Sequence, residues 1–441
     1  SDVYKRQVRH RDDTIVVPSS HKVDDDDPAY IRVDLTRLRR TVNPRAEWRQ
    51  MFDENGRLMA SHYWREDMNG VDWDGVLNRY RPLVDLCHVV DDLHDILWET
   101  VAELNTSHSY VSASGAAGDS DMRAGLLGAD VSSGNDGAKV VRVIPGESSD
   151  PRAWSPLRAA GVAVTEGDVI VAVDGRKVGA DGNLGELLEG SAGRVVELTV
   201  RRGENERQVA VVPMADEAPL RYHDWVASRR RYVEEHSGGR LGYLHVPDMV
   251  SDGWAELHRQ IGEATRHEGV IADVRFNHGG HTSQLVVERL ARRVVGWDYS
   301  RWYATADTYP QNAVRGPIVM VTNQWAGSDG DIVAAATQAM GYAKVIGERS
   351  WGGVVGIDGR FDLVDGTSVT QPRYAGWYGS YGWGVENHGV DPDIVVTVSP
   401  EDWEADRDVQ LDAAIAECLR QLDDKPAATA PELPGPAFDR C

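Results

Sequence analysis

From residue 239 onward, short apolar runs alternate with helical stretches, and this alternation constrains the fold more than any other feature of the sequence. The runs GVIADVRFN, GPIVMVTN and AKVIGE are rich in β-branched residues, as buried strands are. The stretches GWAELHRQIGEATRH, TSQLVVERLARRVV and GDIVAAATQAMG, which lie between them, are typical of helices. Strands that alternate with helices join through right-handed crossovers, so the sequence predicts an α/β fold with a largely parallel sheet.

The region before residue 239 has a different character. Apolar residues at helical spacing predict that residues 41–106 are mostly α-helical, and those in the first helix are Trp48, Met51, Phe52, Leu58, Met59 and Tyr63. The stretch SASGAAGDSDM (112–122) is a Gly/Ser/Ala/Asp hinge and marks a boundary. The strands GAKVVRVIP, GDVIVAVDG, RVVELTVRR and RQVAVVPM follow it, and they predict a small β-rich module.

These patterns predict a multidomain α/β (α+β) protein. We exclude SDVYKRQ (1–7), which resembles a vector remnant, and we expect the native chain to extend further N-terminal. The predicted parts are an N-terminal remnant (1–40), a helical subdomain (41–113), a β module (120–214), an α/β domain (215–424) and a flexible Pro/Ala-rich tail (425–441).

Composition narrows the function classes. The 70 acidic residues outnumber the 47 basic ones, for a net charge of −23, so the electrostatic footprint of a nucleic-acid binder is missing and anionic membranes are disfavoured. No stretch approaches the ~18 apolar residues of a membrane span. The 3 cysteines are far apart, which fits a reducing compartment. We therefore expect a soluble, cytoplasmic protein with neither nucleic-acid nor membrane partners.

No metal or other cofactor is expected. No Cys/His spacing suggests zinc. The stretch GSDGD superficially resembles a calcium loop, but the acidic ladder and the terminal Glu of an EF-hand are missing. The acidic run HKVDDDDPAY (21–30) is typical of a solvated loop.

Ser328 lies in NQWAGSDGDIVAAA, where an apolar strand stops and a helix begins. Two interpretations compete. Ser328 could be the N-cap of the helix, with Asp331 completing a capping box. Alternatively, its Oγ could be a nucleophile on a tight turn at the carboxyl edge of the sheet, where open α/β sheets place their ligands.

Other segments offer the groups that a serine nucleophile needs. In DVRFNHGGH, Gly279 and Gly280 lack a Cβ and could bring an N–H close to a substrate. The N–H of Asp329 lies at a helix N-terminus, and two such amides can form an oxyanion hole.

Candidate partners for the nucleophile come from distant parts of the chain. The segment NTSHSYV (105–111) holds a Ser–His pair, and histidine is the usual base. With 14 histidines, spacing alone selects none of them. Glu386, in GWGVENHGVDPDIVV, could orient a base, although composition alone favours a surface acid.

Together and in this order, several motifs resemble the C-terminal half of the tricorn proteases, which are cytosolic peptidases related to the C-terminal processing peptidases. The motifs are EWRQMF, GVDWDGVLNRY, ELNTSHSYV, SPLRAAGVAVTEGDVIVAVDG, DVRFNHGG, NQWAGSDGDI, GERSWGGVVGI and VENHGVDPDI. The resemblance runs from about residue 40 to about residue 420. It implies a PDZ-like module near 124–214 and a crotonase-like catalytic core, with no N-terminal β-propeller except for a candidate terminal strand in YIRVDLTRL (30–38).

The resemblance also implies roles for individual residues. Ser328 would be the nucleophile and His108 the general base, with Ser107 and Glu386 completing a tetrad. The oxyanion hole would then combine the N–H of Asp329 with that of a glycine in NHGG.

For that glycine, Gly280 is the first choice and Gly279 the second. His278 replaces a glycine of the family's triple-Gly turn, which the backbone tolerates if φ stays negative. Asp298, in GWDYS, matches the acid that favours basic P1 side chains from a neighbouring subunit, which implies a homo-oligomer, typically a hexamer.

The predicted function is therefore that of a serine endopeptidase that cleaves oligopeptides through an acyl-enzyme. One alternative is a Ser–Lys processing peptidase, for which Lys344 is the only lysine between Ser328 and residue 424. Another is a non-catalytic scaffold whose PDZ-like module binds peptide C-termini, with AGLLGADV (124–131) as a weak candidate for the carboxylate loop.

Overall fold

The computed structural model describes residues 39, 41–113, 122–179 and 183–433, together with the backbone of three N-terminal strands. These strands, β1 (Arg9–Arg11), β2 (Thr14–Val17) and β3 (Ile31–Asp34), form an antiparallel sheet. Strand β3 lies in the stretch 30–38, where a terminal propeller strand was predicted. The excluded residues 1–7, the predicted acidic loop at 21–30 and most of the predicted hinge (114–121) lie outside the described residues.

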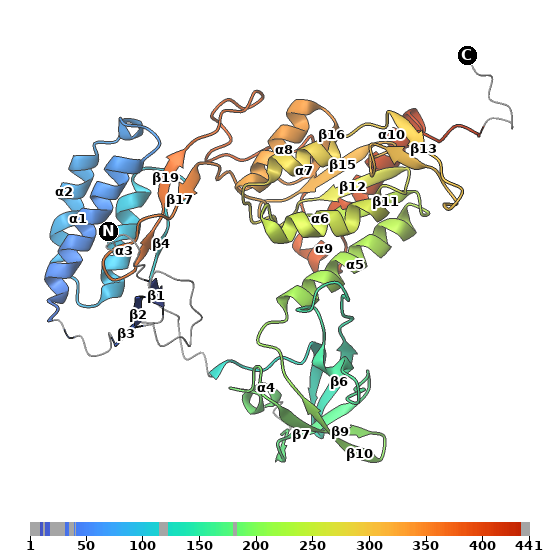
Figure 1. The fold of residues 1–441 in the computed structure, drawn as a ribbon, viewed down its shortest axis with the longest axis horizontal. Coiled ribbons are helices and arrows are strands. Elements are labelled where there is room, and N and C mark those ends of the chain that lie inside the picture. Colours follow the sequence, from blue (N-terminus) through green and yellow to red (C-terminus); the bar gives the residue numbers. More distant parts are fainter. Residues whose placement is uncertain are drawn as a thin grey trace.

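The first body of the protein is helical (Figure 1). It contains α1 (Pro44–His62), a 3₁₀ turn η3 (Met68–Gly70), α2 (Trp73–Val84) and α3 (Val90–Ala102). Side chains cap the first two α-helices, since Asn43 accepts from the amide of Ala46 and Asp72 from that of Gly75. The apolar stripes of the helices meet in one core, which includes Met51, Phe52, Leu58, Leu93 and Leu97.

The second body is a β-rich module. Its strands are β5 (Ala129–Gly134), β6 (Gly137–Val143), β7 (Val169–Val173), β8 (Arg176–Lys177), β9 (Val196–Arg202) and β10 (Asn205–Val211). The sheet runs β10-β9-β7-β6-β5, with β8 paired to β7, and the short helices η5 (Pro156–Arg158) and α4 (Leu184–Leu187) accompany it. The predicted strands are present. Strand β5 was not predicted because its sequence, ADVSSG, lacks apolar alternation.

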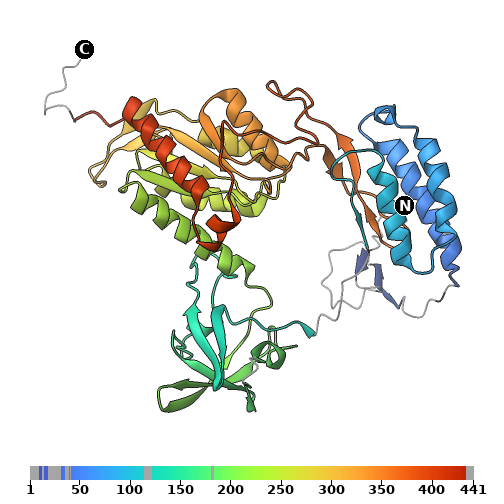
Figure 2. The same cartoon turned by 180° about the vertical axis from the view of Figure 1, so that it is seen from behind.

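The third body contains the predicted parallel α/β sheet, which is confirmed. Its 5 strands are β11 (Leu241–His245), β12 (Gly269–Asp273), β15 (Ile318–Thr322), β16 (Ala343–Gly347) and β20 (Ile394–Val395), in that order and parallel to one another. Helices α6 (Ser251–Ala264), α7 (Ser283–Leu290) and α8 (Asp329–Met340) share one core with the sheet. Helices α5 (Ala218–His236) and α10 (Val409–Asp424) pack on its other face (Figures 1 and 2).

Three smaller elements complete this body: the antiparallel pair β13 (Gly296–Asp298) and β14 (Asp307–Tyr309), and the short helix α9 (Pro400–Glu404). Helix α5 was not predicted. Leu220, Val226 and Val233 are its only buried residues, so its apolar stripe is too sparse to stand out among its charged residues.

A segment between β16 and β20 crosses from the α/β body to the helical body (Figure 1). It carries β17 (Gly356–Asp358), β18 (Ser368–Val369) and β19 (Gln371–Tyr374). Strand β18 pairs with β4 (Val111–Ser112), which follows the helices, and the amide of Trp64 donates to the carbonyl of Pro372 at 2.8 Å. Leu363 and Val369 lie in the helical core, so this segment joins the two bodies.

The first residues of the predicted flexible tail are packed rather than free. The Ala428 amide donates to the Arg315 carbonyl at 2.8 Å, the Arg315 guanidinium donates back to the Ala428 carbonyl, and Ala427 packs against the core under α10. Residues 434–441 lie outside the described part of the chain. Within the described part, no helix is long and apolar enough to cross a membrane.

Candidate active site

Ser328 lies on the turn between β15 and α8, directly before the first helical residue. Its φ of 57° and ψ of −120° are unusual for a residue with a side chain, and such conformations persist where the surrounding structure imposes them. The Ser328 side chain accepts no capping hydrogen bond from the first turn of α8. The capping-box interpretation of this serine is therefore wrong, and its Oγ is not occupied by the helix.

The glycine turn that follows β12 lies against this serine. A Cβ on Gly279, whose φ is +77°, would collide with the Ser328 side chain, and a Cβ on Gly280, whose φ is +146°, would collide with the Met249 carbonyl. Both positions therefore require glycine. His278 is not among the residues with positive φ, so the backbone accommodates it.

The amides around Ser328 differ in how they are used. The Gly279 amide donates to Oδ1 of the buried Asn277 at 2.9 Å, so it is occupied. The amides of Gly280 and Asp329, by contrast, have no hydrogen-bond partner among the described residues. The carboxylate of Asp329 is held aside by the Ser283 amide, at 3.0 Å. One free N–H group thus follows the serine directly and the other belongs to the residue after Gly279, which contacts it; an oxyanion hole requires two such free donors.

Ser107, His108 and Glu386 form a hydrogen-bonded group. The Ser107 hydroxyl donates to Oε2 of Glu386 at 3.0 Å, and its Oγ lies 3.0 Å from Nδ1 of His108. Because the single hydroxyl proton points at the carboxylate, Nδ1 must carry a proton and donate to Ser107. Nε2 of His108 is then left with a free lone pair, which is the tautomer that a general base needs.

The surroundings of His108 keep its imidazole neutral near pH 7. Burial lowers its pKa below the ordinary 6.5, and the negative charge of Glu386 opposes this shift only in part. The rings of Tyr110 and Trp351 approach it edge-on, with centroid distances of 5.7 and 5.3 Å. Thr370 donates to the His108 carbonyl and so fixes the backbone at this residue, whose φ is 61°.

Trp351 lies between the group that contains His108 and the turn that contains Ser328. Its ring contacts His108, and a Cβ on Gly327 would approach the same ring to 2.6 Å. The Trp351 amide donates to the Ala326 carbonyl at 3.0 Å. Among the described residues no hydrogen bond joins His108 to Ser328, and such bonds often form only when substrate binds.

The sequence reasoning missed Trp351 and misread Asp331. Trp351 stands in the motif GERSWGGVVGI, which contributed to the resemblance but suggested no role. Asp331 was considered only as part of a capping box. Its carboxylate accepts from the Ser328 amide, as half of a capping box would, but also from the amides of Gly352 and Gly353, at 2.8 and 3.2 Å.

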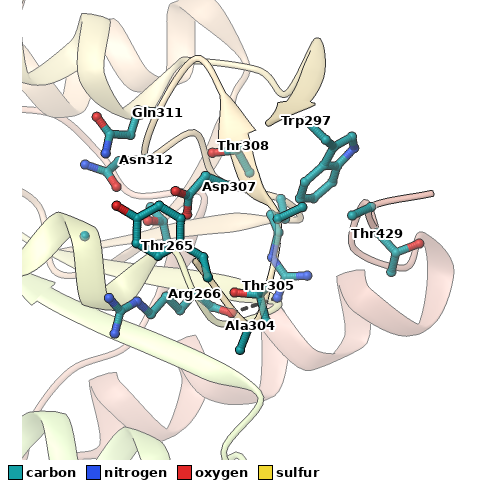
Figure 3. A pocket seen from close by; sticks show the side chains of 15 residues that line it. Thr265, Arg266, Trp297, Ala304, Thr305, Asp307, Thr308, Gln311, Asn312 and Thr429 are labelled. Atoms are coloured by element: carbon teal, nitrogen blue, oxygen red, sulfur yellow. Dashed lines mark hydrogen bonds between the residues drawn. The ribbon is translucent and has the colours of Figure 1, made fainter. Parts of the chain in front are cut away.

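Asp298 does not lie with Ser328 and His108. It ends β13, where its backbone is paired with Asp307, and its exposed side chain makes no hydrogen bond or ion pair with any residue that the structure describes. The pair β13–β14 borders an open pocket of about 940 Å³, whose walls include Thr265, Arg266, Trp297, Asp307 and Asn312 (Figure 3). Arg266 precedes β12 in the chain, so this pocket lies at the amino ends of the strands, whereas Ser328 follows a carboxyl end.

A smaller pocket, of about 440 Å³, adjoins Glu386. Tyr63, Trp64 and Trp383 supply aromatic walls, and the rings of Trp64 and Trp383 stack with their centroids 5.9 Å apart. This pocket was also missed, because its walls come from the helical body and from the segment near residue 383, which are far apart in sequence.

Lys344 does not approach Ser328. It lies at the amino end of β16 and pairs with Asp393, 3.4 Å away, while Ser328 follows the carboxyl end of the neighbouring parallel strand. In the loop at 124–131, the amides of Gly125 and Leu126 donate to the carbonyls of Leu188 and Met214, so these two amides are not free to bind a carboxylate. In the part of the chain that is described, no group of three or more His, Cys, Asp or Glu side chains could hold a metal ion.

Comparison with known proteins identifies three segments. Residues 240–396 match the model of peptidase family S41, residues 125–216 that of the tricorn protease PDZ domain, and residues 44–102 that of the tricorn protease C1 domain. Tricorn protease homolog 1 of Streptomyces coelicolor is 59% identical over 424 residues, which cover 95% of this chain and 40% of that protein. Tricorn protease of Thermoplasma acidophilum is 38% identical over 377 residues, which cover 85% of this chain and 35% of that protein.

A crystal structure of the tricorn protease superposes on the chain with a TM-score of 0.86 at 34% identity, covering 95% of this chain and 41% of the other. The fold and these matches define a multidomain protein with a domain of peptidase family S41. More narrowly, the chain belongs to the tricorn protease family. It spans only about two fifths of the length of the relatives named here, 40% and 35% of each.

Proposed function

We propose that this chain is a serine endopeptidase that cleaves oligopeptides through an acyl-enzyme. The observation that carries the proposal is the hydrogen-bonded group of Ser107, His108 and Glu386, which leaves Nε2 of a neutral imidazole free to accept a proton. Two further observations support the proposal. The Ser328 hydroxyl does not cap α8 and could act as the nucleophile, and the free amides of Gly280 and Asp329 could form the oxyanion hole.

The proposed reaction follows from these positions. Oγ of Ser328 attacks the scissile carbonyl as Nε2 of His108 takes its proton, and the negative oxygen is held by the amides of Asp329 and Gly280. His108 then protonates the leaving amine, and the acyl-enzyme forms. A water molecule, deprotonated by the same imidazole, releases the second product.

Glu386 acts on the charge that develops in this reaction. When His108 becomes an imidazolium, the carboxylate stabilises it through the Ser107 hydroxyl. The same carboxylate accepts from the amides of Ser107, Val354 and Val355 at 2.7, 2.8 and 3.0 Å, so it is held in place before substrate arrives. No Ser–Lys dyad is proposed, because Lys344 lies at the other end of the sheet.

The test is digestion of a mixed peptide library, with the cleavage sites read by mass spectrometry. The wild-type chain should cleave, and the Ser328→Ala variant should not. A fluorophosphonate probe should label Ser328 in the wild type alone. Full cleavage by the variant, or labelling at another residue, would exclude the proposed nucleophile.

We also propose the setting in which the peptidase works. The chain is divided into a helical subdomain (41–113), a PDZ-like domain (120–214) and a catalytic α/β domain (215–424). It acts in the cytoplasm as a homo-oligomer, a hexamer by the family resemblance. Asp298 of one subunit favours basic P1 residues in the site of its neighbour, consistent with its exposed place at the far end of the sheet from Ser328.

Light scattering tests the assembly, and the Asp298→Ala variant tests the specificity. This variant should lose preference for cleavage after Lys and Arg while it still cleaves after apolar residues. An unchanged cleavage pattern in a confirmed oligomer would remove Asp298 from the site.

A further inference from the structure

Residues 351–355, which we call the strap, are held between two carboxylates. The amides of Gly352 and Gly353 donate to Oδ1 and Oδ2 of Asp331, at 2.8 and 3.2 Å. The next amides, those of Val354 and Val355, both donate to Oε2 of Glu386, at 2.8 and 3.0 Å. The strap therefore donates to two carboxylates in succession. The first, Asp331, lies on the helix that follows Ser328, and the second, Glu386, belongs to the hydrogen-bonded group of His108.

Asp331 is well placed to anchor the strap. It lies in the first turn of α8, directly after the turn that carries Ser328, and its side chain is fully buried. Burial raises its pKa to about 6, while hydrogen bonds from the Ser350 side chain and from the amides of Gly352, Gly353 and Ser328 oppose the rise. A buried carboxylate is costly unless such donors satisfy it, so Asp331 and the strap depend on each other.

The strap in turn contacts the catalytic groups of the proposed reaction. Its first residue, Trp351, packs its ring against His108 and against Gly327, the residue before the nucleophile. Its last amides fix Glu386, which holds Ser107 and, through it, the imidazole. The strap has little freedom to move, because Gly352 has a φ of +90° and lies tightly against the backbone of His388 and Gly389.

We propose that Asp331 is a positioning residue for catalysis: by clamping the strap, it sets the distance and orientation of His108 relative to Ser328. Asp331 touches neither substrate nor reacting atoms and acts through Trp351 and Glu386. The inference rests on the proposed peptidase function. It assigns a catalytic purpose to a carboxylate that would otherwise count only as a satisfied buried acid.

The main experiment is the Asp331→Asn variant. The amide has the same shape, but one oxygen acceptor becomes an NH₂ donor that faces a strap N–H, so one hydrogen bond is lost and the strap loosens. Because small misplacements of catalytic groups cost about 10²-fold, we expect kcat to fall by about 10- to 100-fold while KM stays within about 3-fold. Hydrogen exchange of the strap amides, read on peptides spanning 350–356, should become at least about 10-fold faster.

Asp393→Asn is the matched control. Asp393 also accepts a hydrogen bond from a backbone amide, that of Val345 at 2.8 Å, but it pairs with Lys344 at the amino end of β16, whereas the strap follows the carboxyl end of that strand. This variant should leave kcat and strap exchange at wild-type values. If the loss of Asp331 were purely structural, it would lower the melting temperature without changing kcat of the folded fraction.

The possible outcomes separate the two proposals. Wild-type kcat, or unchanged strap exchange, in folded Asp331→Asn overturns the positioning role, while Ser328-dependent cleavage by the wild type leaves the peptidase function standing. Absence of Ser328-dependent cleavage in the wild type overturns both.

If Asp331→Asn does not fold, Trp351→Leu takes its place, because Trp351 is 48% exposed and its replacement is tolerated by the core. The strap should then stay clamped while kcat falls at least about 5-fold at nearly constant KM. Wild-type kcat in this variant would overturn the proposal.

Discussion

The nucleophile side and the base side of the proposed site are built in different ways. Ser328 and the glycine turn follow the carboxyl ends of β15 and β12, which are neighbours in the parallel sheet, so the topology of one body brings them together. Ser107 and Glu386 are 279 residues apart and belong to different bodies. The first half is therefore a property of one fold, whereas the second exists only while two bodies are docked.

This difference predicts that changes on the two sides will have different signatures. A substitution on the nucleophile side should lower kcat and leave the stability of the sheet unchanged. A change on the base side should also weaken the contact between the bodies, since hydrogen bonds to a charged group contribute about 1.5–3 kcal/mol each.

The largest effect is expected for Ser328→Ala. Turnover should fall by about 10⁴- to 10⁶-fold, while the melting temperature stays unchanged because the hydroxyl does not cap α8. Calorimetry and peptide cleavage measure the two quantities. Ser399→Ala is the matched control, since Ser399 does cap α9 by accepting from the Asp402 amide, and its loss should cost about 1 kcal/mol of stability at full activity.

The next largest effect is expected for Gly280→Ala. The new Cβ would collide with the Met249 carbonyl, so the turn must shift and the Gly280 amide with it. Loss of one oxyanion donor lowers kcat by about 10²- to 10³-fold. Gly161→Ala is the comparison: its φ is +84°, but its Cβ would meet open space, so it should lose stability alone. Equal activity of the two variants would remove Gly280 from the oxyanion hole.

Glu386→Gln should affect both catalysis and docking. The neutral amide no longer stabilises an imidazolium. It also has only one acceptor oxygen in place of two, so it cannot accept all the hydrogen bonds that the amides of Ser107, Val354 and Val355 donate to the carboxylate. We expect kcat to fall by about 10²-fold and the free energy of unfolding to fall by about 1–3 kcal/mol. A fall in kcat with no loss of stability, measured by denaturant titration, would contradict the docking role of this carboxylate.

The pH dependence tests the base, in a pH range that it shares with Asp331, whose pKa burial raises to about 6. Burial lowers the pKa of His108 below 6.5, so its imidazole stays neutral to lower pH than a free histidine. Only the neutral form accepts a proton, hence kcat/KM should be constant near pH 7 and fall about tenfold per unit once the pH drops below that pKa. A pH–rate profile with an acid midpoint above 6.5 would contradict this assignment.

The smallest effect is expected for Lys344→Ala. Its exposed pair with Asp393 contributes less than about 1 kcal/mol, and it lies at the wrong end of the sheet for a dyad. Activity should stay within about 2-fold of the wild type in the same peptide assay. A large loss would instead favour Ser–Lys chemistry.

The nucleophile side of the site could be predicted from the sequence pattern, whereas the base side could not. The strand–turn–helix around Ser328 and the glycines at 279 and 280 are local patterns, so periodicity and turn chemistry were enough to single them out. His108 and Glu386 carry no local signal that separates them from a surface histidine and a turn acid, and only the resemblance selected them. Their pairing depends on contacts made far along the chain.

The features that the sequence did not predict also depend on contacts between residues that are not close in the chain. The burial of Asp331 under the strap depends on a contact between residues 21 positions apart in the chain. The place of Trp351 and the pairing of β4 with β18 depend on contacts between segments that are hundreds of residues apart. Helix α5 was missed for another reason: it has only three buried residues, and charged residues such as Arg229, Arg230 and Arg231 stand between them, so its apolar period is weak.

The short ladder between β4 and β18 has a further consequence. His108 lies just before β4, and the ladder registers only Val111 with Val369 and Ser112 with Ser368. A ladder of two residue pairs opens at a lower temperature than a sheet of 5 strands that is buried on both faces. On heating, the proposed peptidase activity should be lost while the circular dichroism spectrum is still that of the native protein, and it should return on cooling as the ladder re-forms.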